Sequence, residues 1–186
     1  MPSPISPGQA EALGITTRHE RMDNAELRFR LCASDGSSYI RTEAVADSGW
    51  QNSHLHRYVH ELTVVQKGAM VMAEERPEGL RVLVLRAGES YLCPLNLPHN
   101  RYLLPGSVVH TVKYGDALPA ADWVACPQLD PRCRALDVDA LLRADSPSPA
   151  RDLDLLEGMF SPMQYFPPAL EQLVEQLARL PGIGRK

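Results

Sequence analysis

The sequence predicts a mainly β fold, a sandwich or barrel of short strands, in a chain of 186 residues. Apolar and polar residues alternate with a period of two over most of residues 26–126, which is the pattern of half-buried strands. Turn-forming pairs such as Asp35-Gly36 and Lys67-Gly68 separate these segments. Strands that recur at about 8–12 residues with such turns are typical of sandwiches and barrels.

The expected strands follow one another along this central zone, each bounded by glycine, proline, asparagine or aspartate. In chain order they are Glu26–Cys32, Ser38–Ala46, His54–Tyr58, Leu62–Gln66, Ala69–Glu75, Leu80–Arg86, Ser90–Cys93, Asn100–Leu104, Ser107–Tyr114 and Asp122–Cys126. Their length and spacing leave no room for long helices between them, which favours an all-β core.

The two ends of the chain differ from the central zone 26–126. Residues 1–25 are mixed in character and form an N-terminal extension, with a short helix expected around Gly8–Leu13. Residues 127–186 form a linker and a C-terminal helical extension, which we expect to pack on the barrel. Its strongest element is an amphipathic helix over Pro168–Leu180. The apolar face of this helix either packs on the barrel or forms a dimer contact. We expect the protein to be a homodimer.

Composition and charge exclude several classes of partner. The chain has 19 Lys and Arg against 23 Asp and Glu, a net charge of −4, and no basic block, which argues against nucleic acid or acidic lipid. No apolar run approaches the about 20 residues of a membrane span. The N-terminus lacks the basic start and apolar core of a signal peptide. We therefore expect a cytoplasmic protein whose four cysteines are free thiols.

Closely spaced histidines indicate where the chemistry lies. His54 and His56 stand two residues apart, so on a strand their imidazoles lie side by side on one face. After a tight bend Glu61 begins the next strand and can return to the same point, and His99 is the candidate for a fourth ligand. Two alternatives stay open. One is a pair of strand-surface histidines without metal, and the other is a helical zinc pair of His56 and His60, which the β-branched residues after it disfavour.

These stretches resemble the two sequence motifs of the cupin family. The first reads Gly49-x4-His54-x-His56-x4-Glu61-x6-Gly68, in which the first glycine stands one residue closer than in the family pattern. The second reads Gly88-x5-Pro94-x-Asn96-x2-His99-x3-Leu103, where asparagine replaces the usual glycine and leucine the usual asparagine. A turn tolerates asparagine at the glycine position because asparagine enters the left-handed region.

The resemblance covers about residues 26–126 and implies a single antiparallel cupin β-barrel that holds one divalent transition metal. Carried over by position, the metal ligands are His54, His56, Glu61 and His99. Three imidazoles and one carboxylate suit Fe(II), which we favour, and also Mn(II), Ni(II), Co(II) or Zn(II). Such a ligand set leaves coordination positions open, as a catalytic metal requires.

Strand parity supplies two candidate catalytic residues, Arg41 and His110. If the face that carries Arg41 turns inward, its guanidinium can hold a substrate carboxylate or phosphate in bidentate fashion; otherwise it is a solvated arginine on an edge strand. His110 lies on an otherwise apolar face of its strand. It is either a general base or hydrogen-bond donor to substrate, or a core histidine with its own partners.

The expected function is that of a metal-dependent enzyme on a small organic molecule, with a dioxygenase as the first hypothesis. An isomerase, decarboxylase, lyase or cyclase on the same site is the second hypothesis, and a non-catalytic small-molecule sensor is the third. A divalent ion with one carboxylate ligand keeps a net charge of about +1. We therefore expect the ligand to be a small carboxylate, a 1,2-dicarbonyl or a catechol-like anion.

Overall fold

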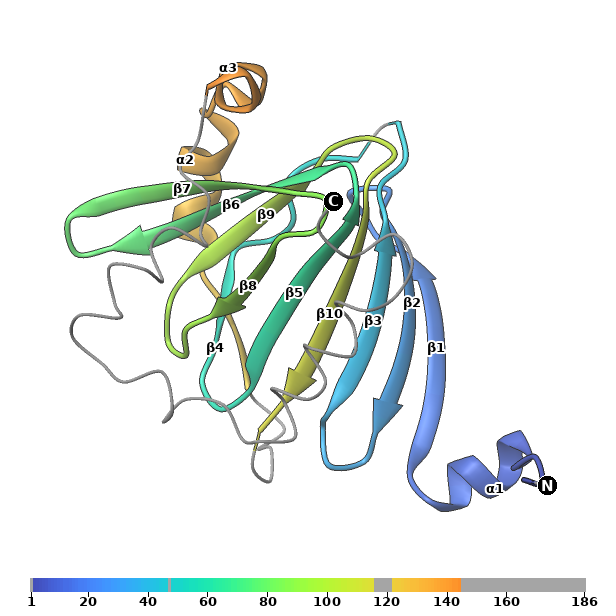
Figure 1. Cartoon of the computed structure of the whole chain (residues 1–186). Coiled ribbons are helices and arrows are strands. Elements are labelled where there is room, and N and C mark those ends of the chain that lie inside the picture. Colours follow the sequence, from blue (N-terminus) through green and yellow to red (C-terminus); the bar gives the residue numbers. More distant parts are fainter. Residues whose placement is uncertain (1, 47, 116–121, 145–186) are drawn as a thin grey trace, which may run out of the picture.

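The computed structural model describes residues 2–46, 48–115 and 122–144, and two sheets make up most of it (Figure 1). The strands are β1 (Ile15–Arg21), β2 (Leu27–Ala33), β3 (Ser38–Glu43), β4 (His54–His56), β5 (His60–Lys67), β6 (Ala69–Arg76), β7 (Gly79–Arg86), β8 (Ser90–Cys93), β9 (His99–Leu103), β10 (Val108–Tyr114) and β11 (Trp123–Ala125). One sheet has the order β1-β2-β3-β10-β5-β8 and the other β11-β4-β9-β6-β7. Every strand pair is antiparallel, which confirms the predicted fold class.

Apolar side chains from both sheets form the main core. Its buried members are Ala44, Val65, Met70, Met72, Leu83, Leu85, Leu103 and Val109, with Tyr91 packed against them. They come from β5, β6, β7, β9 and β10 and from the residue after β3, so the core joins the six-stranded sheet to the five-stranded sheet. Burial of this apolar surface is the main force that holds the sheets together.

Each predicted strand overlaps one of β2 to β11, so these predictions are confirmed. Strand β1 was not predicted, because Ile15–Arg21 is a polar stretch without apolar alternation. Its backbone nevertheless pairs with β2 along its full length, from Ile15 opposite Ala33 to Arg21 opposite Leu27. The sheet therefore begins inside the segment 1–25 that the sequence indicates as an extension.

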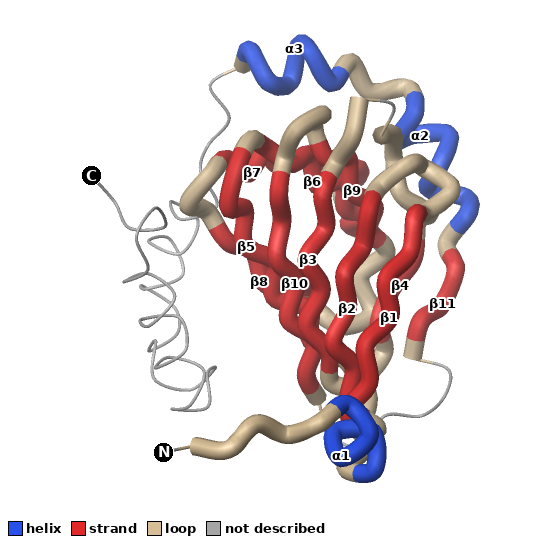
Figure 2. Tube along the Cα trace, turned by 90° about the vertical axis from the view of Figure 1, so that its right-hand side faces the viewer, coloured by secondary structure: helices blue, strands red, loops and turns tan. Residues whose placement is uncertain are grey.

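Short helices lie at opposite ends of the described structure, one beside β1 and the others beside the five-stranded sheet (Figure 2). Helix α1 (Pro7–Ala12) matches the helix expected near the N-terminus, and Ser6 and Gln9 form a capping box at its start. After β11 come a 3-10 turn (Pro127–Leu129) and the helices α2 (Asp130–Arg134) and α3 (Val138–Arg143). No helix in these described parts is long and apolar enough to cross a membrane. The helix predicted over Pro168–Leu180, with its dimer face, lies outside the described residues.

The first strands of the six-stranded sheet carry polar side chains on their inner face. Phe29, Leu31 and Tyr39 point outward and are 38%, 47% and 40% exposed, whereas Arg30 and Thr42 are buried. This is the reverse of the usual pattern, in which apolar residues face the interior. The interior at this end is therefore a polar pocket.

Candidate metal centre

The structure brings the four predicted metal ligands together. Strand β4 presents two imidazoles on one face, the start of β9 pairs with it so that His99 lies opposite His54, and β5 supplies the carboxylate from the other sheet. The four-ligand cluster consists of His54, His56, Glu61 and His99. All four residues are buried, and one ligand atom from each lies within 4.8 Å of the others. The cluster therefore joins the two sheets at one point.

The donor set of this cluster fits a divalent cation. Glu61 Oε2 lies 3.4 Å from His56 Nε2 and 3.6 Å from His99 Nε2. Within the described part of the chain, His99 Nε2 is buried without a hydrogen-bond partner, and Glu61 Oε2 accepts no hydrogen bond but lies in an ion pair with Arg101. Buried acceptors left unpaired cost about 1–3 kcal/mol each. A cation bound between them would satisfy both atoms, and this ligand chemistry is that of first-row transition metals.

Each imidazole of the cluster is held by its other ring nitrogen, so that Nε2 faces the centre. The acceptors of the three Nδ1–H groups are Asn52 O at 2.8 Å for His54, Asp122 Oδ2 at 2.5 Å for His56, and Leu97 O at 3.0 Å for His99. Such outer partners fix the tautomer and the ring orientation of metal-binding histidines. Burial, and then the neighbouring His99, lower the pKa of His54 to about 2, so this imidazole is neutral and ready to bind a metal.

Asp122 is a residue of the candidate site that the sequence did not indicate. Its Oδ2 accepts from His56, while its Oδ1 accepts from the backbone amides of Arg57, Tyr58 and Val59 at 3.1, 2.7 and 3.0 Å. It therefore fixes both the ring of a ligand and the bend between β4 and β5. Burial opposes ionisation of Asp122, but the amide of Tyr58 and the ring of His56 hold the pKa of its carboxyl below the usual value.

Replacing Asp122 with asparagine should weaken metal binding by about 10–100-fold, because loss of an outer partner of a metal-binding histidine has that effect. Equilibrium dialysis with Zn(II) measures the change. The control is Asp35→Asn, which alters an exposed turn carboxylate that accepts from Ser37. If Asp122→Asn and Asp35→Asn bind metal equally well, Asp122 does not support the cluster.

Two cations lie beside the cluster, buried Arg101 and partly buried Lys113, and neither was predicted. Arg101 stands two residues after His99 on β9 and therefore shares its face. Its Nη2 lies 2.5 Å from Glu61 Oε2 without hydrogen-bond alignment, and its Nε has no hydrogen-bond partner among the described residues. Lys113, directly opposite Glu61 in the pairing of β10 with β5, places Nζ 3.1 Å from His56 Nε2 and 3.6 Å from Glu61 Oε1. We call Arg101 and Lys113 the cation pair.

The cation pair keeps Glu61 ionised. Burial acts to raise the pKa of this carboxyl, but Arg101 first, then Lys113, and then the nearby rings of His56 and His99 hold it well below its usual value. A buried carboxylate with two cationic neighbours is available as an anionic metal ligand at neutral pH. The cations in turn have donors to spare for a second anion.

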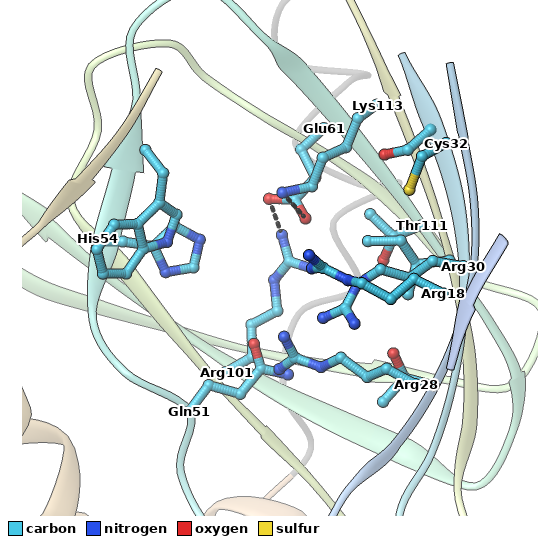
Figure 3. A pocket seen from close by; sticks show the side chains of 14 residues that line it. Arg18, Arg28, Arg30, Cys32, Gln51, His54, Glu61, Arg101, Thr111 and Lys113 are labelled. Atoms are coloured by element: carbon cyan, nitrogen blue, oxygen red, sulfur yellow. Dashed lines mark ion pairs between the residues drawn. The ribbon is translucent and has the colours of Figure 1, made fainter. Parts of the chain in front are cut away.

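The cluster opens into a cavity of about 320 Å³. Its lining includes the cationic side chains Arg18, Arg28, Arg30, Arg101 and Lys113, together with Glu61 and His54 (Figure 3). Glu20 and Glu26 pair with the arginines of β1 and β2. Five cations against three carboxylates leave two positive charges in excess, in a chain whose net charge is −4. The cavity therefore favours anions.

The structure places Arg41 and His110 away from this cavity, which corrects the inward orientation considered for them. Arg41 forms an ion pair with Glu43 and donates to Gln66 at 3.0 Å. His110 contacts Gln66 at 2.5 Å and the hydroxyl of Tyr39 at 2.6 Å. Neither residue lines the cavity. The two are register partners on the outer face of β3 and β10, whose inner faces carry Thr42 and Thr111.

Other residues singled out in the sequence have local roles. His60 lies outside the cluster, where its ring stacks on Tyr114 at 5.2 Å. Asn96 has φ of 58°, so it adopts the left-handed conformation that its place in the second motif predicts. Cys93 lies 3.3 Å from His99 Nδ1, and burial raises the pKa of its thiol to about 12. It is therefore a protonated neighbour of the cluster. All four cysteines are free.

Comparisons with known proteins leave the chemistry open. No protein-family model matches the chain, and no curated protein matches it. Solved structures similar to it include three of oxalate decarboxylase from Bacillus subtilis. An arginine-to-alanine mutant of that enzyme has a TM-score of 0.47 and 13% sequence identity to this chain. A tryptophan-to-phenylalanine mutant has a TM-score of 0.48 and 14% identity. The structure of the enzyme determined at pH 4.6 has a TM-score of 0.47 and 13% identity. Each match covers 91% of this chain and 38% of the other, so the chain spans less than two fifths of these structures.

Proposed function

We propose that this chain is a metal-dependent cupin enzyme that acts on a small organic anion bound beside a divalent metal ion. One observation carries the proposal: three imidazoles anchored through Nδ1 and one carboxylate converge in a buried cluster, next to two cations whose charge the described residues do not fully neutralise. A purely structural cluster would have its buried polar atoms paired within the chain.

The residues divide into two roles. The four-ligand cluster would hold the metal, which when bound would act as a Lewis acid and leave positions open for substrate. The cation pair would hold the anionic group of the substrate, since Arg101 has an unpaired Nε among the described residues and Lys113 carries a charge close to the cluster. Charge-assisted hydrogen bonds of this kind are about twice as strong as neutral ones and orient the bound group.

Two reactions fit this arrangement. We propose oxygenation by a dioxygenase with Fe(II) as the first, as the ligand set and the cupin motifs suggest. Decarboxylation is the second, and the cation pair favours it, because a carboxylate substrate would be held beside the cluster by Arg101 and Lys113. Both reactions need the same metal ligands and the same anion site.

Metal content and gas exchange test this proposal. Protein purified without chelator is analysed for metals, then loaded separately with Fe(II), Mn(II), Co(II), Ni(II) or Zn(II), and offered oxalate, pyruvate and catechol. Uptake of O₂ would identify an oxygenase, and release of CO₂ without net uptake a decarboxylase. The matched control is protein with Glu61→Gln, which removes the anionic ligand. Tight anion binding without turnover of any offered compound in any metal form would overturn the enzyme assignment in favour of a sensor.

A further inference from the structure

A second group of cations lines the cavity on β1 and β2, apart from the cation pair. Arg18 and Arg30 stand directly opposite each other in the pairing of these strands, and both line the cavity with Arg28 (Figure 3). We call Arg18 and Arg30 the arginine pair. Like charges placed directly opposite each other destabilise a sheet. Such a placement therefore requires a compensating interaction.

Within residues 2–46, 48–115 and 122–144, only part of that compensation is present. Arg18 Nε lies 3.2 Å from Glu20 Oε2, and Arg30 Nη1 contacts the same oxygen. One carboxylate thus faces two guanidinium groups, which leaves one positive charge in excess. Buried Glu26 does not neutralise it, because this carboxylate is already paired with Arg28. The side chain of Arg30 is only 9% exposed, so water solvates the excess positive charge of the arginine pair poorly.

The arginine pair and the cation pair face the same interior from different places. Lys113 belongs to the cross-strand row that includes Ser38 and Cys32, and Arg30 stands two residues from Cys32 on β2. Strand β3 separates β2 from β10. Two strand spacings of about 4.8 Å and a two-residue step of about 7 Å put the backbones of Arg30 and Lys113 about 12 Å apart. Side chains that extend into the cavity shorten this gap to the dimensions of a small molecule.

We propose that the arginine pair is a second anion subsite and that the substrate is a small organic dianion. One anionic end lies at the four-ligand cluster beside Arg101 and Lys113. The other end, a carboxylate, phosphate or sulfonate, is held by Arg30 and Arg18. This inference rests on the proposed function, because it assigns the far end of the molecule that the metal centre would bind. The competing explanation is that inward charges on edge strand β1 only discourage pairing with other chains.

Calorimetric titration of the full chain loaded with Zn(II) tests the subsite. The probes are the monocarboxylates acetate and butyrate and the dicarboxylates succinate, glutarate and adipate. The best dicarboxylate should bind about 10–100-fold more tightly than the monocarboxylates, the gain expected from charged hydrogen bonds. Arg30→Gln should remove this gain and leave the affinity for butyrate and the zinc stoichiometry unchanged. The control Arg41→Gln, on the outer face of β3, should bind all probes like the natural chain.

Each failure points to a different claim. If the zinc-loaded chain binds dicarboxylates no more tightly than monocarboxylates, the second subsite is wrong while the metal centre stands. If the chain retains no zinc, the proposed function itself fails. Should Arg30→Gln not fold, as judged by circular dichroism, Arg18→Gln serves instead, because that side chain is 64% exposed and its loss is tolerated more easily. A full dicarboxylate preference in Arg18→Gln would likewise overturn the subsite.

Discussion

The variants His54→Ala, His56→Ala and His99→Ala should each lose most of the bound metal. Each removes one of four ligand atoms that lie within 4.8 Å of one another. Even the outer partners of metal-binding histidines are worth about 10–100-fold in affinity, so loss of a direct ligand should exceed that range. Elemental analysis after dialysis against a fixed concentration of Zn(II) gives the occupancy of each variant.

The matched control for these variants is His60→Ala. His60 belongs to the same histidine-rich stretch but stacks on Tyr114 outside the cluster, so its removal should leave the metal content unchanged. Full occupancy in His99→Ala, combined with loss of metal in His60→Ala, would contradict the ligand assignment. Circular dichroism of each variant separates loss of a ligand from loss of the fold.

Replacing Arg101 with glutamine should weaken oxalate binding by about 10–100-fold while the metal is retained. Arg101 is buried beside the cluster, and its Nε lacks a partner within the described residues. Loss of hydrogen bonds from a charged donor costs about 1.5–3 kcal/mol, which corresponds to this range of affinity. Titration of the zinc-loaded protein with oxalate measures the change.

Arg41→Gln provides the comparison for Arg101→Gln. Arg41 is bound to Glu43 and Gln66 on the outer face of the sheet, so we expect its loss to leave oxalate affinity unaltered. If Arg41→Gln lowers the affinity and Arg101→Gln does not, anion binding takes place elsewhere than in the cavity beside the four-ligand cluster.

The convergence of the four candidate ligands was predictable because their signal is local. His54 and His56 share a face by strand parity, and the bend that returns Glu61 takes only a few residues. His99 was identified from the spacing of the second motif, and the pairing of β9 with β4 places it opposite His54. The strand predictions succeeded for the same reason, because alternation of apolar and polar residues between turn residues is a local signal for a short strand.

The residues that line the cavity were harder to predict because a polar cavity reverses the usual hydrophobic signal. On β10 the inner face carries Thr111 and Lys113, while His110 shares the outer face with Val112. Parity that assumes an apolar interior therefore assigns His110 to the wrong side. The same reversal occurs on β2, where Phe29 points outward and Arg30 is buried, so the apolar pattern does not indicate that Arg30 faces the interior. An inverted pattern of this kind on several neighbouring strands is itself a signal for a charged pocket.

Asp122 and β1 depend on contacts that no local pattern carries. Asp122 lies 66 residues from His56, and only the folded chain shows that its carboxylate meets the imidazole. Strand β1 is polar and gains its place through backbone pairing with β2. Backbone hydrogen bonds stabilise a strand without leaving a signature in its side chains, which is why such an edge strand is missed.

Anomalous diffraction from crystals grown with Zn(II) tests the central claim most directly. We predict one strong peak between His54 Nε2, His56 Nε2, His99 Nε2 and the carboxylate of Glu61, about 2.0–2.2 Å from each ligand atom. The absence of a peak there, or a peak bound to other side chains such as Cys126 and Cys133, would contradict a metal centre at the four-ligand cluster.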